Sequence, residues 1–140
     1  MDKNNLLETL QQILETEYTD VFLYYNEAGL FEKKIKGGEK LSKIYKDFSL
    51  DELRHADIIS QKILNLGGKP VWEYKNISIP KSIRDSLRNH LDREAKSYQT
   101  YTNLIENITD RDFKIVLKGI RENEKEHIEE IKDFLRKFNF

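Results

Sequence analysis

The chain has 140 residues, enough for one well-buried core, and its 24 Lys and Arg nearly balance its 25 Asp and Glu, giving a net charge of −1. This balance leaves no electrostatic footprint for nucleic acid or an anionic membrane. The absence of cysteine excludes disulfides, iron–sulfur clusters and thiolate-bound iron, so any metal must be held by nitrogen and oxygen ligands.

The composition favours long helices with solvated outer faces. Hydrophobic residues make up 38% and charged residues 35%, with six glycines and two prolines. The start of the sequence lacks a signal-peptide apolar region, and no stretch approaches the length of apolar residues that spans a membrane. We therefore expect one all-α domain over residues 1–140, located in the cytoplasm.

The first predicted helix covers residues 5 to 36, with Asn5 as its N-terminal cap and two glycines at its end. Apolar residues recur every three or four positions along one face, as they do on the inner face of a bundle helix. Glu17 stands on this face where Leu or Ile is expected. A carboxylate therefore interrupts the middle of a predicted core stripe.

The second predicted helix covers residues 41 to 66 and ends at Gly67-Gly68. Its apolar face is interrupted by Glu52 and His55, which are three residues apart and so project toward a single ion. Burying both without partners costs several kcal/mol. A bound metal explains the pair with the fewest assumptions.

A long connection follows, with turn residues and β-formers but no helical period. Fully extended, residues 67 to 79 reach about 43 Å, and the second helix spans about 39 Å. The connection can travel the length of that helix. This favours parallel second and third helices joined by one long crossover in a four-helix bundle.

The third predicted helix starts at Pro80 and carries Glu94 at the middle of its apolar face. Thr109 begins a predicted capping box, and the resulting short turn requires an antiparallel fourth helix over residues 110 to 138. That helix carries Glu124 and His127, a second Glu-x-x-His pair. The two halves of the chain thus repeat one plan.

Together the four helices supply four carboxylates and two imidazoles at mid-length: Glu17, Glu52, His55, Glu94, Glu124 and His127. This is the ligand inventory of a di-iron or di-manganese carboxylate site. Two divalent cations neutralise four carboxylates, and neutral imidazoles complete the coordination. Zinc is also compatible. Alternatively, each pair is solvated and each lone glutamate lies on a misjudged helix face.

Four further side chains are weaker candidates. Tyr24 and Tyr101 each follow a helix glutamate by seven residues, which suits a hydrogen-bond donor or electron source beside the metals, or plain core packing. His90 either guards an entry path, takes an extra ion or is a partly exposed structural histidine, and we favour the last. Asp20 is either an auxiliary carboxylate or, as we favour, a surface aspartate.

The chain resembles the ferritin-like superfamily, and bacterioferritin most of all. The resemblance rests on these motifs: Glu17-Tyr-Thr-Asp-Val-Phe-Leu-Tyr24, Asp51-Glu-Leu-Arg-His-Ala-Asp57, Leu66-Gly-Gly-Lys-Pro70, Glu94 and Glu124-Lys-Glu-His127. It implies a ferritin-like bundle in which the six residues above bind two iron ions per subunit, with Glu52 and Glu124 as bridges. It also implies oxidation of Fe(II) by O2 or H2O2. Manganese or a mixed Fe/Mn pair would need no change of ligand.

Two departures from bacterioferritin matter, and a third difference concerns the rival rubrerythrins. Bacterioferritins have a haem-binding methionine where this chain has Leu53, so no haem is expected. The sequence stops at Phe140 without the short fifth helix of 24-subunit cages, so we expect a homodimer or larger homo-oligomer and leave a 12- or 24-subunit cage open. Rubrerythrins usually have a glutamate where this chain has Ser97. A rubrerythrin-like peroxide scavenger remains the alternative enzyme, and a metal-free helical dimerisation module the alternative outside enzymes.

Overall fold

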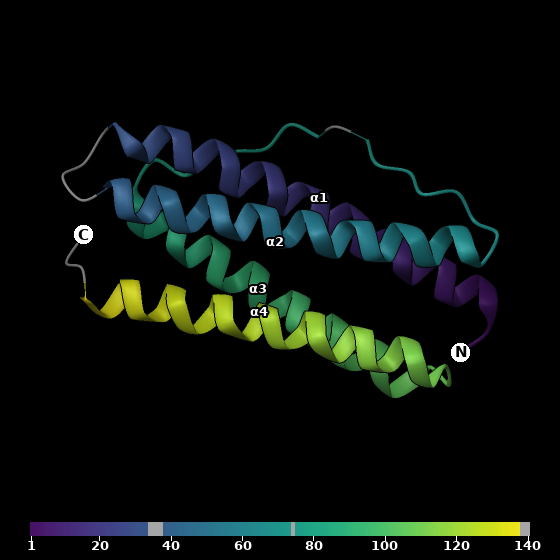
Figure 1. The fold of residues 1–140 in the computed structure, drawn as a ribbon. Helices are drawn as coiled ribbons and strands as arrows, with labels where there is room; N and C mark the ends of the chain where they lie inside the picture. The colour runs from purple at the N-terminus through teal and green to yellow at the C-terminus, as the bar shows by residue number, and fades with distance from the viewer. Residues whose placement is uncertain (34–37, 74, 138–140) are drawn as a thin grey trace. The chain divides into compact units, whose positions relative to one another are not determined.

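The computed structural model describes residues 1–33, 38–73 and 75–137, and these form four helices and no strand. The helices are α1 (Lys3–Glu32), α2 (Gly38–Asn65), α3 (Ile83–Asn107) and α4 (Arg111–Lys137), in chain order (Figure 1). None of the described helices is both long and apolar enough to cross a membrane. The structure divides into two compact units, Asp2–Ile79 and Pro80–Phe140 with Met1.

The first unit, here the N-terminal hairpin, pairs α1 with α2. Its centre is aromatic: the fully buried ring of Tyr24 packs edge-on against Tyr45 and Phe48, with centroids 5.1 and 5.4 Å away. Ser49 Oγ on α2 donates a 2.8 Å hydrogen bond to the Val21 carbonyl on α1. These contacts fix which residues of the two antiparallel helices lie opposite one another.

The end of α2 is set by two glycines, as the sequence predicts. Gly67 has φ +84°, and the Gly67 and Gly68 amides donate to the Leu64 and Ile63 carbonyls, each at 2.9 Å. This is a Schellman cap, which satisfies carbonyls at the helix end. A Cβ at position 68 would lie 2.8 Å from Leu7 Cδ2. Any larger residue at position 68 would therefore require the Leu7 side chain to shift.

The connection after α2 lies against α1 of its own hairpin and has no helix or strand in its described residues. Gln11 donates to the Lys69 carbonyl and accepts from the Val71 amide at 3.3 Å. Trp72 stacks on Phe22, with centroids 5.1 Å apart. The long connection is therefore anchored along α1 rather than free.

The second unit, the C-terminal hairpin, pairs α3 with α4 through a three-residue connection, residues 108–110. Ser82 caps α3 by accepting from the Asp85 amide at 3.1 Å, and Asp110 caps α4 by accepting from the Phe113 amide at 3.1 Å. Such caps satisfy amides that lack a partner in the first turn. The short turn confirms that these two helices are antiparallel neighbours.

Several predicted helix limits were wrong by a few residues, because capping side chains decide them. Asp2, not Asn5, caps α1 by accepting from the Asn5 amide at 2.8 Å. The third helix begins at Ile83 after its Ser82 cap, not at Pro80, and Asp110 replaces Thr109 as the cap of the fourth. The predicted ends at residues 36 and 138 lie outside the described residues.

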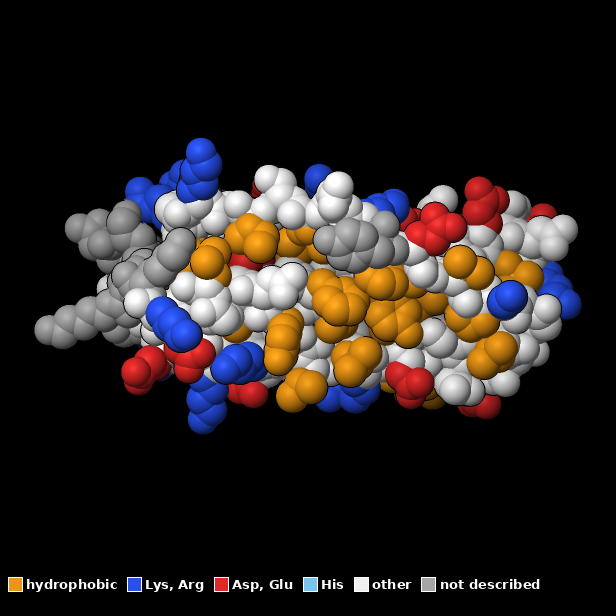
Figure 2. Space-filling model, turned by 90° about the horizontal axis from the view of Figure 1, so that it is seen from above, with side chains coloured by type: hydrophobic (Ala, Val, Ile, Leu, Met, Phe, Trp, Pro, Cys, Tyr) orange, Lys and Arg blue, Asp and Glu red, His pale blue; other side chains and the backbone are white. Residues whose placement is uncertain are grey.

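One part of the N-terminal hairpin exposes large apolar side chains. Phe22 and Tyr25 on α1 are 41% and 61% exposed, and Leu50 and Leu53 on α2 are 65% and 45% exposed. Figure 2 shows hydrophobic side chains gathered along one face. We call these four residues the α1–α2 apolar face.

Candidate metal centre

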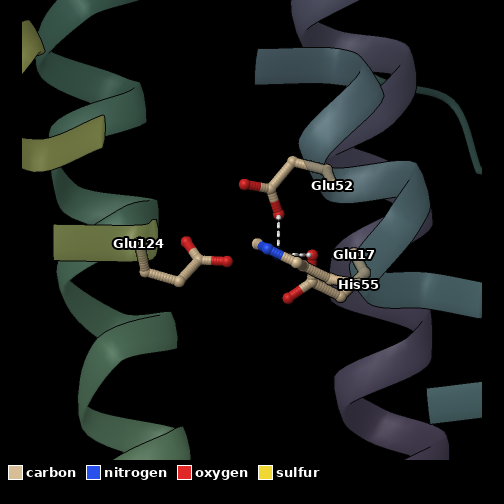
Figure 3. A group of neighbouring side chains, drawn as sticks. All are labelled: Glu17, Glu52, His55 and Glu124. Atoms are coloured by element: carbon tan, nitrogen blue, oxygen red, sulfur yellow. Dashed lines mark ion pairs between the residues drawn. The ribbon is translucent and has the colours of Figure 1, made fainter. Parts of the chain in front are cut away.

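The N-terminal hairpin brings three of the predicted ligands together in its interior. Glu17 on α1 and Glu52 and His55 on α2 are each at most 1% exposed. His55 Nδ1 lies 3.5 Å from Glu17 Oε2 and 3.7 Å from Glu52 Oε2 (Figure 3). One ligand atom from each residue lies within 4.8 Å of the others. One nitrogen and two oxygens therefore converge, and we call this group the first half-site.

The C-terminal hairpin brings together the other three. Glu94 on α3 and Glu124 and His127 on α4 are also at most 1% exposed, and each offers a ligand atom within 4.8 Å of the others. His127 Nδ1 lies 3.3 Å from Glu94 Oε1. This second half-site again contains two carboxylates and one imidazole.

The two half-sites share one plan. In each, the first helix of the hairpin supplies a lone glutamate and the second supplies Glu-x-x-His. In each, the histidine Nδ1 faces the lone glutamate, at 3.5 Å in the first and 3.3 Å in the second. Residues three apart on a helix project from one face, which explains why both Glu-x-x-His pairs point inward together.

Apolar neighbours hold these polar groups in the interior. Phe48 and Ala56 lie one turn before Glu52 and one turn after it on α2, and Ile120 and Ile131 flank the pair on α4; all four are buried. The apolar faces of these helices therefore hold the ligands in the interior, although burying such polar groups costs free energy. Such placement is typical of functional groups rather than of stabilising ones.

The buried residues fit bound cations by their chemistry. Among the described residues, the buried side chains include six carboxylates, Glu17, Asp20, Glu27, Glu52, Glu94 and Glu124, and the three histidines, but no lysine or arginine. Buried charges are normally paired or coordinate metals. Carboxylate oxygens and imidazole nitrogens suit iron, manganese and zinc. The residues present therefore fit a metal site built from nitrogen and oxygen ligands.

The weaker candidates are more buried than predicted. We expected Asp20 at the surface and His90 partly exposed, but they are 1% and 0% exposed, so both predictions were wrong. Asp20 lies three residues after Glu17, and His90 four residues before Glu94, so each shares the buried face of a ligand helix. Tyr24 and Tyr101 are also buried, at 0% and 1%.

Sequence reasoning overlooked Glu27 altogether. This side chain is fully buried on α1, seven residues after Asp20. A seven-residue spacing places two residues on nearly the same helix face, so the signal was present once Asp20 was known to be inside. An isolated glutamate near a helix end is usually solvated, which hid it.

Comparison with known proteins agrees with this architecture. The family profile of the ferritin-like domain, Ferritin, matches residues 7–140 and so spans both hairpins. A bacterioferritin from Streptomyces coelicolor is 35% identical over 68 residues, which are 49% of this chain and 40% of that relative. The chain thus aligns with less than half of that relative's length.

Helix content and the family match confirm the predicted fold class, an all-α ferritin-like four-helix bundle with one long connection. The chain belongs to the ferritin-like domain family.

Proposed function

We propose that the two half-sites face each other within one ferritin-like domain, residues 1–140, and together bind two iron ions per subunit. The repeated half-site carries this proposal, because each hairpin offers two carboxylates and one imidazole in the same arrangement. The family match across both hairpins supports it. The ligands are Glu17, Glu52, His55, Glu94, Glu124 and His127, and the same set accepts manganese or a mixed Fe/Mn pair.

The proposed activity is oxidation of Fe(II) by O2 or H2O2, a ferroxidase reaction used in iron handling or oxidative-stress defence. A bound metal pair would supply redox chemistry at a site shielded from bulk water. The four carboxylates would neutralise the cations, with Glu52 and Glu124 as bridges, and the neutral imidazoles would donate nitrogen lone pairs. The similarity to a bacterioferritin over half of the chain favours this reaction.

The alternatives are less well supported. A metal-free dimerisation module would require the six polar residues to be solvated, whereas each is at most 1% exposed. A rubrerythrin-like peroxide scavenger would usually have a glutamate in place of Ser97, which lies on the buried face of α3 three residues after Glu94. Peroxide turnover separates the two enzymes when it is measured once with excess Fe(II) and once with an iron-free chemical reductant. A ferroxidase consumes peroxide only while Fe(II) is supplied, whereas a peroxide scavenger also turns over with the other electron donor.

Metal analysis tests the proposal directly. After anaerobic loading with Fe(II) and desalting, we expect about two metal ions per chain in the wild type. Glu52→Ala and His55→Ala should each lower this number, because each removes a ligand. Asp57→Ala is the matched control: Asp57 is exposed on α2 two residues from His55 and should keep the wild-type number. Fewer than one metal per wild-type chain, or unchanged binding in both ligand variants, would refute a dinuclear site.

We also infer a homodimer or larger homo-oligomer, as the family resemblance implies. The four exposed side chains of the α1–α2 apolar face support this, since exposed apolar surface beyond scattered single residues commonly marks an interaction site. Leu53, in the place of the bacterioferritin haem methionine, is part of that face. The absence of haem, the cytoplasmic location and the assembly size stay predictions.

A further inference from the structure

A column of buried polar side chains continues along α1 beyond the first half-site. Asp20 and Glu27, 1% and 0% exposed, share the buried stripe of α1 with Glu17 and Tyr24. Neither carboxylate belongs to the six proposed ligands. Glu27 lies ten residues after Glu17, about 15 Å along the helix axis at 1.5 Å per residue. The column therefore leads from the half-site toward the end of α1 at Glu32.

Helix α2 brings an independent polar group to this column. Ser42 is 2% exposed, and within the described part of the chain its hydroxyl oxygen has no hydrogen-bond partner. A buried hydroxyl left in this state costs about 1–3 kcal/mol. This cost is explained if the Ser42 hydroxyl oxygen serves as a ligand for a cation.

The helix register places this hydroxyl beside Glu27. Ser49, seven residues after Ser42 on the same face of α2, donates to the Val21 carbonyl, so this face looks at α1. Because α1 and α2 are antiparallel, moving seven residues back along α2 corresponds to moving seven forward along α1, from Val21 to Ala28. The Tyr24–Tyr45 contact lies between the two levels and fits the same register. Ser42 is thus directed at the turn of α1 that contains Glu27.

The donor atoms in this column are of the kind that hard divalent cations select. Carboxylate and hydroxyl oxygens suit Mn(II), Mg(II) and Fe(II). One carboxylate and one hydroxyl are too few to hold a resident ion tightly but enough to lower the cost of a passing one. Carboxylates also create a negative potential, which raises the association rate of cations.

We propose that Glu27 and the Ser42 hydroxyl form a transit position for divalent cations, with Asp20 as the next step toward Glu17. This inference rests on the proposed function, because Glu17 must belong to a metal site for the column to lead to one. Glu27 and Ser42 therefore affect the rate at which the metal site fills. They do not affect the number of ions that the metal site finally holds.

Loading with Co(II), which has visible absorption on nitrogen and oxygen ligands, tests this proposal without any oxidation reaction. The full-length protein is mixed with Co(II), the absorbance is followed in time, and bound metal is counted at the end. We expect Glu27→Gln to load about tenfold more slowly than wild type and to reach the same final stoichiometry. Ser42→Ala should also slow loading, by a smaller factor. Glu8→Gln, an equal charge change at an exposed position of α1, should load at the wild-type rate.

Each result has one interpretation. Loading of Glu27→Gln at the wild-type rate, or a lower final stoichiometry in that variant, overturns the transit position. If circular dichroism shows that Glu27→Gln is unfolded, Ser42→Ala decides, and an unchanged rate in that variant overturns it. Failure of the wild type to bind about two Co(II) ions per chain refutes the dinuclear site instead, which separates the two proposals.

Discussion

Tyr24 shows how one residue can serve both packing and chemistry. Its ring is fully buried and makes edge-on contacts with Tyr45 and Phe48, so plain core packing is documented. It also lies two turns from Glu17, about 10 Å along the helix axis, on the same buried stripe. This closeness to Glu17 suits the proposed role of the Tyr24 phenol as a hydrogen-bond donor or electron source.

The substitution Tyr24→Phe distinguishes these roles, since it keeps the ring and removes only the hydroxyl. We expect the free energy of unfolding to change by no more than about 1.5 kcal/mol, the net contribution of one hydrogen bond. Metal stoichiometry should stay at the wild-type value while Fe(II) oxidation by O2, followed by stopped-flow absorbance, becomes slower. An oxidation rate equal to wild type would leave Tyr24 as a packing residue only.

At the scale of elements, the two hairpins depend on glycine in different ways. Gly67 adopts a left-handed conformation that the cap of α2 requires. Gly119 lies within α4, and a Cβ there would meet nothing within 4 Å. The same chemical change should therefore have opposite effects at these two positions.

We expect Gly67→Ala to lower the free energy of unfolding by about 1–2 kcal/mol, because an L-residue is strained in the left-handed region. Gly119→Ala should raise it by about 0.5–1 kcal/mol, because alanine loses less backbone entropy in a helix. Urea unfolding followed by circular dichroism measures both. Effects of the same sign in the two variants would contradict this account of the cap.

At the scale of the whole molecule, the proposed oligomer depends on exposed apolar side chains of the N-terminal hairpin. The α1–α2 apolar face exposes four large apolar side chains on one hairpin, and Leu50 is 65% exposed. A charged side chain at such a position costs the single chain little but would have to be desolvated in an interface.

Light scattering coupled to size-exclusion chromatography should therefore give the wild type a mass at least twice the 16.7 kDa of one chain. The mass of Leu50→Glu should be smaller. Ile115→Glu is the matched control, because Ile115 is 68% exposed on α4, outside the apolar face, and should keep the wild-type mass. A wild-type monomer would remove the proposed interface. A mass of 12 or 24 subunits would instead indicate a cage.

The sequence by itself determined the helix order, the long connection and the six candidate ligands, because each depends on local periodicity. Glu17, Glu52 and His55 stood out as polar residues in an apolar pattern of period 3.6, and spacing alone predicted that Glu52 and His55 share a face. The glycine cap of α2 was equally readable, since few residues other than glycine tolerate its φ.

Only the tertiary structure decided which other polar residues are inside and which side chains cap the helices. Asp20 and His90 looked solvated in the sequence because Asp and His occur on most helix surfaces, and their burial depends on which face the neighbouring helix covers. Asp2 and Asp110 compete with nearby capping residues, and backbone geometry chooses among them. Spacing fixes which residues share a face, whereas packing fixes which face is buried, and the column from Glu17 through Asp20 to Glu27 needed both.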